Sequence, residues 1–369
     1  MGDMHSIADM QENFLFQSIS DYVIIFLMVS VSFIISQLFI LRLRKNFLES
    51  NKKIVQFKTY GFLSEIVFSD DKSDAIIDPK IHEFKSKVPI DRNWCKDLLI
   101  QNIIDLDKNF KGQSTDFLLS LYFKLELHEY TDKLVNSNIW YLKAKGIYYL
   151  RELKYTQAAP KIYTFLNHSH PELRSAALLA FISLSEDDNP LGVVKEYMDT
   201  ISYVEMLNLM HIIQRRKFQK PDNLTSWLSL KDDSHVVFAL KLIVYFNDLE
   251  SGKQVTELLN SKNSKVRLEA IKSIGKLFFV EAEQDLIVGF MKENEENQIE
   301  TILTLKEIGG QDSIQFLHHL LGLNRSSEIN LTAMYALQAL DKSFAELQFD
   351  PEKSLDQAKK HVESPYLEI

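Results

Sequence analysis

The chain has 369 residues, of which 46% are hydrophobic and 25% are charged, a composition typical of a folded protein. Its 11 glycines and 8 prolines are few for this length, which favours an all-α fold over α/β and β-barrel folds. The single cysteine, Cys95, excludes the disulfide-stapled secreted class and a cysteine-based zinc site, and it suits a reducing compartment.

The first element expected along the chain is a transmembrane helix over residues 22–41, a stretch without any charge. Its only polar side chains are Ser30, Ser32, Ser36 and Gln37. Twenty helical residues are about 30 Å long, the thickness of the hydrocarbon core of a bilayer. A cleaved signal peptide needs a basic segment in front, whereas residues 1–41 contain no Lys or Arg. We therefore expect an uncleaved anchor, preceded by a short extracytoplasmic segment of residues 1–21.

The two flanks of this span differ in charge, and the difference predicts the orientation. The amino-terminal flank is acidic, whereas the other flank carries six basic residues and one acid, Glu49. The basic residues are Arg42, Arg44, Lys45, Lys52, Lys53 and Lys58. Because Lys and Arg stay on the cytoplasmic side, we expect the amino terminus outside and the body of the chain in the cytoplasm. The same cluster could bind anionic lipid, although fixing the topology is the simpler interpretation.

Residues 42–91 are expected to form a basic juxtamembrane segment and a linker. Residues 54–68 could be a helix that lies near the membrane surface, and residues 69–91 hold two prolines and frequent charges, which favours a linker or an irregular docking segment. Of the net charge of −9, residues 1–41 contribute −4 and residues 42–60 contribute +5, which leaves −10 on the rest of the chain. An acidic body is not typical of nucleic-acid-binding proteins.

Residues 92–137 are expected to be an atypical amino-terminal cap made of two helices. The sequence KGQ separates the two apolar-periodic stretches, and its Gly112 is the expected end of the first helix. Ser114 or Thr115 is then the expected N-cap of the second helix.

Residues 138–341 contain an internal repeat, the strongest pattern after the anchor. Each copy has a polar turn, an apolar anchor residue, a polar residue next to it, and alanine four positions after the anchor. The clear copies are Leu173/Arg174/Ala177, Val266/Arg267/Ala270 and Ile329/Asn330/Ala333, and weaker copies have anchors at Trp140, Val204, Val236 and Ile299. Anchors recur about every 30 residues, and an amphipathic stretch precedes each one. The pattern predicts that residues 92–341 fold as one right-handed α-solenoid of about seven helical hairpins without β-sheet, with the alanines buried between helices.

The sequences PELRSAALLA, SKVRLEAIKSIG and SEINLTAMYAL begin the second helix of the three clear copies. They resemble the HEAT repeat family, in particular its short bacterial version related to phycobilisome-lyase HEAT-like repeats. The resemblance covers residues 138–341 and implies a right-handed α-solenoid in which Arg174 and Arg267 form a ladder with neighbouring turns. The family pattern is not kept at Glu205, Val237, Glu300 and Asn330. In those copies the ladder is expected to be broken or replaced.

The resemblance also has implications for function. Bacterial membrane-anchored HEAT proteins are thought of as accessories to envelope assemblies, including glycosyltransferase-type polysaccharide systems, which implies the inner membrane of a bacterium. A lyase that acts on bilins is the enzymatic precedent in the family. The similarity falls on residues that build the repeat, so it does not predict catalysis.

Residues 342–369 are expected to contain a short polar helix from Ser354, which could cap the last hairpin, followed by a tail from Pro365.

Reactive and metal-binding side chains are scarce in the sequence. The only close histidine pairs are His168 with His170 and His318 with His319, and neither has a cysteine or acidic partner at ligand spacing. Motifs of phosphate-binding loops, dinucleotide sites, serine hydrolases and zinc proteases are missing. Cys95 lies on an apolar-periodic helix, which is more typical of a packed core thiol than of a nucleophile. We therefore expect no catalytic residue, no cofactor and no metal.

One basic cluster closes the second helix of a repeat unit and could bind a partner. It consists of Arg215, Arg216, Lys217 and Lys220. The simpler interpretation is that these cations pair with the carboxyl end of the helix, and the alternative is a docking spot beside acidic interhelix turns.

These features favour a non-catalytic, membrane-tethered scaffold or accessory subunit that binds a protein partner at the cytoplasmic face of the membrane. The sequence contains a membrane anchor and a repeat surface, but no group of side chains that predicts catalysis. Two alternatives stay open: a HEAT-type lyase, and an adaptor that reads membrane lipid through Lys52, Lys53 and Lys58. A nucleic-acid partner is not expected.

Overall fold

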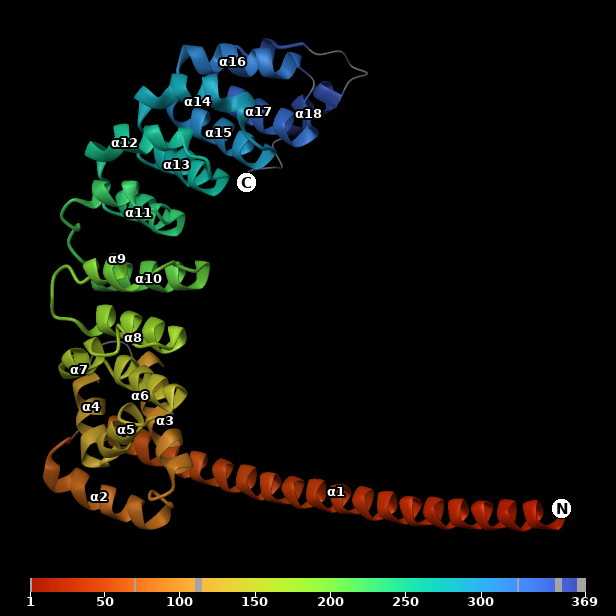
Figure 1. The fold of residues 1–369 in the computed structure, drawn as a ribbon. Coiled ribbons are helices and arrows are strands. Elements are labelled where there is room, and N and C mark those ends of the chain that lie inside the picture. The colour runs from red at the N-terminus through yellow and green to blue at the C-terminus, as the bar shows by residue number, and fades with distance from the viewer. Residues whose placement is uncertain (1, 70, 110–114, 324, 349–353, 364–369) are drawn as a thin grey trace. The chain divides into compact units, whose positions relative to one another are not determined.

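The computed structural model describes residues 2–69, 71–109, 115–323, 325–348 and 354–363. Within these residues every element is a helix and no strand occurs, which confirms the all-α prediction. The chain divides into two compact units, Met1–Tyr155 and Thr156–Ile369 (Figure 1). The first expected repeat, from residue 138, therefore belongs to the same unit as the expected cap.

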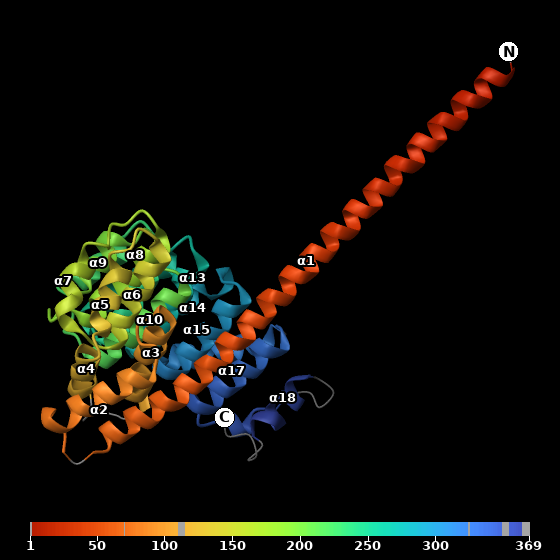
Figure 2. The ribbon, with the colours of Figure 1, turned by 90° about the horizontal axis from the view of Figure 1, so that it is seen from below.

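The first unit combines one very long helix with a compact group of shorter ones. Its helices are α1 (Gly2–Val67), α2 (Asp74–Lys87), α3 (Asn93–Asn109), α4 (Thr115–Lys124), α5 (Leu127–Val135) and α6 (Trp140–Glu152). α1 is a single rod whose amino-terminal part projects away from α2 to α6 (Figures 1 and 2). Only the last turns of α1, where Val55, Leu63 and Ile66 are buried, share a hydrophobic core with the other helices.

α1 continues well beyond the expected span. It runs without a break to Val67, so the expectation of a separate membrane-surface helix over residues 54–68 is wrong. The reason is that the chain offers no helix breaker in this region. The first proline is Pro79, and the first glycine after Gly2 is Gly61, which lies inside the helix.

Most of the expected linker, residues 69–91, is helix α2. Its apolar residues Ile77, Ile81 and Phe84 follow helical spacing and are buried, and the Phe84 ring stacks on Phe62 of α1 with ring centroids 4.0 Å apart. The prolines and frequent charges of residues 69–91 favour a linker when the sequence is considered alone. The burial of this apolar stripe outweighs the cost of a proline inside the helix.

The expected cap also differs from the prediction at its second helix. α4 ends at Lys124, Glu126 adopts a left-handed backbone with φ 57°, and α5 begins at Leu127, so the expected single helix is two helices. The KGQ segment with Gly112, and the expected N-cap Ser114, lie outside the described residues.

A polar network joins three helices of the first unit. The hydroxyls of Tyr130 and Tyr149 each donate to Asp97 Oδ1 at 2.9 Å, and Lys145 Nζ lies 2.6 Å from Asp97 Oδ2. Burial and the Asp97 carboxylate raise the pKa of both tyrosines. The hydroxyls therefore stay protonated, and the network links α3 to α5 and α6.

The second unit alternates short and long helices. Its α-helices are α7 (Ala159–Tyr163), α8 (Pro171–Leu184), α9 (Gly192–Tyr197), α10 (Tyr203–Arg216), α11 (Asp233–Tyr245), α12 (Gly252–Glu257), α13 (Ser264–Lys276), α14 (Glu283–Gly289), α15 (Glu295–Ile308), α16 (Gln311–Gly322), α17 (Ser327–Leu340) and α18 (Ser354–Val362). Short 3₁₀ helices join them, and η2 (Leu224–Ser229) takes the place of the short helix before α11. Among the long helices, α11 contacts α13, α13 contacts α15, and α15 contacts α17 (Figure 1).

The long helices share one register. The N-cap of each lies three residues before an anchor position, and the residue four positions after that anchor is buried in every copy. The anchors are Leu142 in α6 and Leu173, Glu205, His235, Val266, Asn297 and Ile329 in the second unit. They recur every 30 to 32 residues.

This register corrects four of the anchors expected from the sequence. Trp140, Val204, Val236 and Ile299 are displaced by one or two positions from the observed anchors. Val204 lies 65% exposed on the surface of α10, whereas Glu205 takes the anchor position. The sequence pattern requires an apolar anchor, whereas Glu205, His235 and Asn297 are polar, so the pattern predicts the neighbouring apolar residues instead.

A second signature repeats at the ends of the long helices. Twelve residues after the anchor, the backbone is left-handed at Lys154, Lys217, Asn247 and Phe278, with φ between 50° and 55°. The residue after three of them donates its N–H to a carbonyl five residues back: Tyr155 to Leu150, Asp248 to Ile243 and Phe279 to Ile274. This is the Schellman end of a helix, which usually places glycine at the left-handed position. The chain uses other residues there, so glycine gave no signal for these ends.

Replacing Phe278 with glycine should raise the stability of the second unit by about 1 kcal/mol, because a bulky side chain in the left-handed region costs more than the added chain entropy of glycine. The expected result is a higher melting temperature. Asn247→Gly is the matched control and should gain less, since asparagine tolerates this backbone better. A lower melting temperature for Phe278→Gly would contradict the assigned helix end.

Hydrogen bonds between neighbouring turns connect the long helices at their amino ends. The bonds join Ile201 to Ser234, Asp233 to Asn263, Ser264 to Asn297 and Glu295 to Ser326. Each involves a residue within four positions of an anchor, so the polar turns hold successive long helices together.

The last helix, α18, packs against α17, and its Val362 is buried in the core of the carboxyl-terminal hairpin. It occupies the place expected for a capping helix, and the tail from Pro365 lies outside the described residues.

Candidate functional site

The expected basic cluster is not a free surface patch. Arg216 Nη2 donates to the Ser185 carbonyl, and its guanidinium lies 5.5 Å from the centre of the Phe218 ring. Lys220 Nζ pairs at 3.2 Å with Asp248, whose side chain is buried. All four side chains are exposed, but Arg216 and Lys220 join neighbouring turns of the second unit, which leaves Arg215 and Lys217 as the candidates for binding a partner.

Arg215 belongs to an exposed line along α10 that the sequence did not predict. Tyr203, Leu207, His211 and Arg215 follow one another at intervals of four residues and are all exposed. Tyr203 is 72% exposed and Leu207 is 52% exposed, and Val204 lies beside them. We call Tyr203, Val204, Leu207, His211 and Arg215 the α10 face. The i, i+4 spacing of these residues could have revealed it, but the repeat pattern predicts Val204 as an anchor.

The same register positions on the next helices are only partly polar. Lys241 of α11 pairs with Glu269 of α13 at 2.8 Å, and Lys272 of α13 lies 3.9 Å from Glu300 of α15. Burial raises the pKa of Glu300 in spite of the Lys272 charge. The positions equivalent to Leu207 are apolar but only partly exposed, at Val237, Leu268 and Ile299. Leu303 of α15, equivalent to His211, is 40% exposed, so α10 differs mainly in the high exposure of Tyr203 and Val204.

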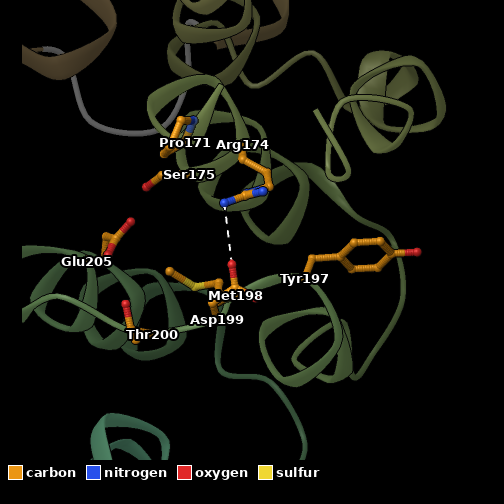
Figure 3. Close-up of a pocket in the computed structure, with 8 residues that line it drawn as sticks. All are labelled: Pro171, Arg174, Ser175, Tyr197, Met198, Asp199, Thr200 and Glu205. Carbon is orange, nitrogen blue, oxygen red and sulfur yellow. Dashed lines mark ion pairs between the residues drawn. The ribbon is translucent and has the colours of Figure 1, made fainter. Parts of the chain in front are cut away.

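A hollow of about 220 Å³ lies at the amino end of α8, between that helix and the segment joining α9 to α10 (Figure 3). Arg174 crosses it and lies 3.6 Å from Asp199, whose side chain is 91% exposed. The remaining lining residues are Pro171, Ser175, Tyr197, Met198, Thr200 and Glu205.

Glu205 is held in this hollow by its own helix start. Its Oε2 accepts from the Ser202 N–H at 2.8 Å, and its N–H donates to Ser202 Oγ at 3.3 Å, which forms a capping box. Burial raises the pKa of Glu205, but hydrogen bonds from Ser175 and Ser202 outweigh it, so the pKa lies below the usual value. Glu205 is thus a structural carboxylate rather than a proton donor at neutral pH.

The histidines and the cysteine show no reactive arrangement among the described residues. His168 Nδ1 accepts from the His170 N–H at 3.0 Å, and His318 pairs with Asp341 at 2.8 Å. In the part of the chain that is described, no three His, Cys, Asp or Glu side chains gather to hold a metal ion. Burial raises the pKa of the Cys95 thiol to about 11, which keeps it protonated.

The basic residues after the apolar stretch lie on the exposed part of α1. Arg42, Arg44, Lys45, Lys52, Lys53 and Lys58 are all exposed. Lys45 lies 3.8 Å from Glu49, and Lys58 Nζ donates to the Lys87 carbonyl of α2 at 3.1 Å. Lys58 therefore also contacts the first unit, whereas the others surround the rod.

The expected repeat positions lie at the junctions between helices. Leu173, Ala177, Val266, Ala270, Ile329 and Ala333 are all buried. Arg267 makes a bidentate pair with Glu293, with Nε to Oε1 at 2.6 Å and Nη2 to Oε2 at 3.0 Å, and it donates to the Ser261 carbonyl at 2.8 Å. Arg267 thus connects two successive turns, whereas the Arg174 pair is long and open to solvent.

No protein-family model and no curated protein matches the chain. Two engineered proteins with crystal structures from the Northeast Structural Genomics Consortium are similar to it. One is 17% identical, with 57% of this chain and 95% of that protein covered and a TM-score of 0.29. The other is 14% identical, with 82% and 86% covered and a TM-score of 0.35. At these TM-scores neither similarity carries an argument about fold or function.

Proposed function

We propose that the chain is a membrane-anchored scaffold or accessory subunit, a HEAT-like right-handed α-solenoid that binds a protein partner at the cytoplasmic face of a bacterial inner membrane. α1 supports the anchor, since it is long and apolar enough to span a bilayer and its most apolar stretch is not buried. The shared register of the long helices supports the repeat. Tethering such a surface raises its effective concentration beside membrane-bound partners.

The α10 face is the observation that carries the binding role. Single exposed apolar residues are ordinary on protein surfaces, whereas adjoining ones mark interaction sites. Tyr203, Val204 and Leu207 adjoin on one helix, and Arg215 is exposed further along it. Tyrosine and arginine are also the residues most enriched at the energetic centres of protein interfaces.

The chemistry of the α10 face fits an amphipathic helix of another protein. Apolar side chains of such a helix would cover Tyr203 and Leu207, and a carboxylate near its end would meet Arg215. The neighbouring Lys–Glu pairs of α11, α13 and α15 would form the polar rim of this interface.

Introducing a negative charge into the α10 face should abolish partner binding. In tagged full-length protein purified from native membranes, Leu207→Glu and Arg215→Glu should each reduce the co-purifying partner at least about tenfold, because each removes a central contact. Arg216 is left unchanged, since it bonds to Ser185. Val288→Glu is the matched control, because Val288 is 63% exposed on α14 and outside the α10 face. Retention of the partner by both α10 variants, or its equal loss from the Val288 variant, would refute the assignment.

The proposed orientation has its own test. The acidic flank before the span and the basic flank after it favour an external amino terminus. Protease added to intact spheroplasts should therefore leave residues 92–369 undigested, and should digest them once the membrane is opened with detergent. Digestion in intact spheroplasts would show the opposite orientation.

A further inference from the structure

The exposed part of α1 between the apolar stretch and the core of the first unit carries an apolar stripe. Leu43, Phe47, Ser50, Ile54 and Phe57 follow one another at alternating steps of four and three residues. Phe47 is 69% exposed and Phe57 is 82% exposed. Alternating steps of four and three are the seam spacing of a coiled coil.

The stripe lies on the side of α1 away from its own unit. Val55, Thr59, Phe62 and Ile66 are buried against that unit, and at 100° per residue they lie roughly opposite Phe57. Because α1 is unbroken from Gly2 to Val67, this part cannot lie flat on a membrane that the same helix crosses. The stripe would stand in water for about 21 Å beyond the bilayer.

The same spacing continues backward through the expected span. Stepping back from Leu43 in the seam pattern leads to Ile40, Ser36, Phe33, Val29 and Phe26. The Ser36 hydroxyl donates to the Phe33 carbonyl at 2.8 Å, so this small side chain is satisfied within its own helix. A 3.5-residue period sustained over this length favours a left-handed coiled coil of two helices. Small residues in its seam allow the two backbones to approach closely.

We propose that α1 pairs in parallel with α1 of a second copy of this chain through this seam, which rests on the proposed anchoring in a membrane. A second copy anchored in the same orientation brings the identical stripe to the same height above the bilayer. Another protein would have to match the spacing in membrane and water alike. The pair would present two repeat bodies side by side to the partner.

None of the charged residues between Leu43 and Phe57 occupies a seam position. Arg42, Lys45 and Lys52 lie at the outer helix positions, away from the seam. Asn46 and Asn51 flank the seam and would face each other across it, where two amides can hydrogen bond. Arg44, Lys53 and Lys58 also flank the seam, and Lys53 of one copy would face Lys58 of the other, although Lys58 donates to the Lys87 carbonyl of its own α2. These like charges oppose the pair, so the apolar seam residues have to outweigh their repulsion.

The area is also sufficient. An aromatic side chain buries about 150–250 Å² when it is covered, so Phe47 and Phe57 alone supply roughly 300 Å² per copy. Leu43, Ile54 and the seam residues inside the membrane add to this. A stable interface needs about 800 Å² per partner, which a seam of this length can reach.

Disulfide trapping in native membranes tests the pair directly. Ser50→Cys places a thiol in the seam, and Lys52→Cys places one on the outer side as the matched control. The buried Cys95 should not react, and the unmodified chain checks this. Oxidation with copper phenanthroline should convert most of the Ser50→Cys chain to a covalent dimer, with at least about tenfold less dimer for Lys52→Cys. Adding Phe47→Glu and Phe57→Glu to Ser50→Cys should remove the dimer.

Each outcome has one meaning. Equal crosslinking at both positions would indicate random collision and overturn the pair, as would a Ser50→Cys chain that stays monomeric in the membrane fraction. A Ser50→Cys adduct with a different protein would assign the seam to that protein instead. Carbonate extraction of the same membranes separates this result from the anchor: release of the chain would refute the anchoring, whereas a retained monomer refutes only the pair.

Discussion

Replacing Glu293 with alanine should lower the free energy of unfolding of the second unit by about 3 kcal/mol, because it leaves the Arg267 charge buried without its partner. The two side chains are only 17% and 10% exposed, and the carboxylate also accepts from Asn297 Nδ2 at 2.6 Å. Loss of one partner of a buried pair costs more than the pair contributes, since the remaining charge cannot return to water.

The fluorescence of Trp227, which is buried in η2, reports on the second unit. Urea unfolding of the full chain in detergent, with Trp94 and Trp140 replaced by phenylalanine, therefore measures the effect. Asp199→Ala is the matched control. Its pair with Arg174 is 3.6 Å long and solvent-exposed, so the change should stay within about 0.5 kcal/mol. Equal losses for Glu293→Ala and Asp199→Ala would contradict the structural role of Arg267.

Ala270→Leu should destabilise the second unit by about 1–3 kcal/mol through overpacking. Ala270 is fully buried four positions after the anchor Val266, in the stripe of α13 that packs against its neighbours. A leucine there has to displace the backbone or side chains of the adjoining helices, because a packed interior has no room for three more carbon atoms.

The same urea experiment measures this change, with Ala339→Leu as its control. Ala339 lies on the exposed side of α17, so a leucine there should change the free energy by less than about 0.5 kcal/mol. If Ala270→Leu unfolds at the same urea concentration as the unchanged chain, the register assigned to the long helices is wrong.

The helical class and the position of the repeats could be predicted because both depend on local periodicity. Leu173, Val266 and Ile329 are apolar anchors with alanine four residues later, and their helices lie where the pattern predicts. Glu205, His235 and Asn297 could not be found in this way. A polar residue can occupy a partly or fully buried position when its own helix start supplies a partner, as Ser202 does for Glu205 and Asp232 does for Nδ1 of His235.

Long-range packing explains the remaining differences. Residues 74–87 form a helix because Ile77, Ile81 and Phe84 have α1 and its unit to pack against, which the local sequence does not reveal. Long-range contacts also explain why the four basic residues do not form one free patch. Arg216 donates to the carbonyl of Ser185, which lies 31 positions earlier in the sequence. A count of charges identified four candidate cations, but only their partners distinguish the structural ones from Arg215.

The most direct test of the binding role is photo-crosslinking in intact cells that express the full chain from its natural locus. A photoreactive phenylalanine analogue at Leu207 samples the α10 face, and the same analogue at Val288 samples the exposed surface of α14. We expect a light-dependent adduct with one distinct protein at Leu207, no such adduct at Val288, and loss of the Leu207 adduct when Arg215→Glu is added. An absence of any adduct at Leu207, or the same set of adducts at both positions, would contradict that role.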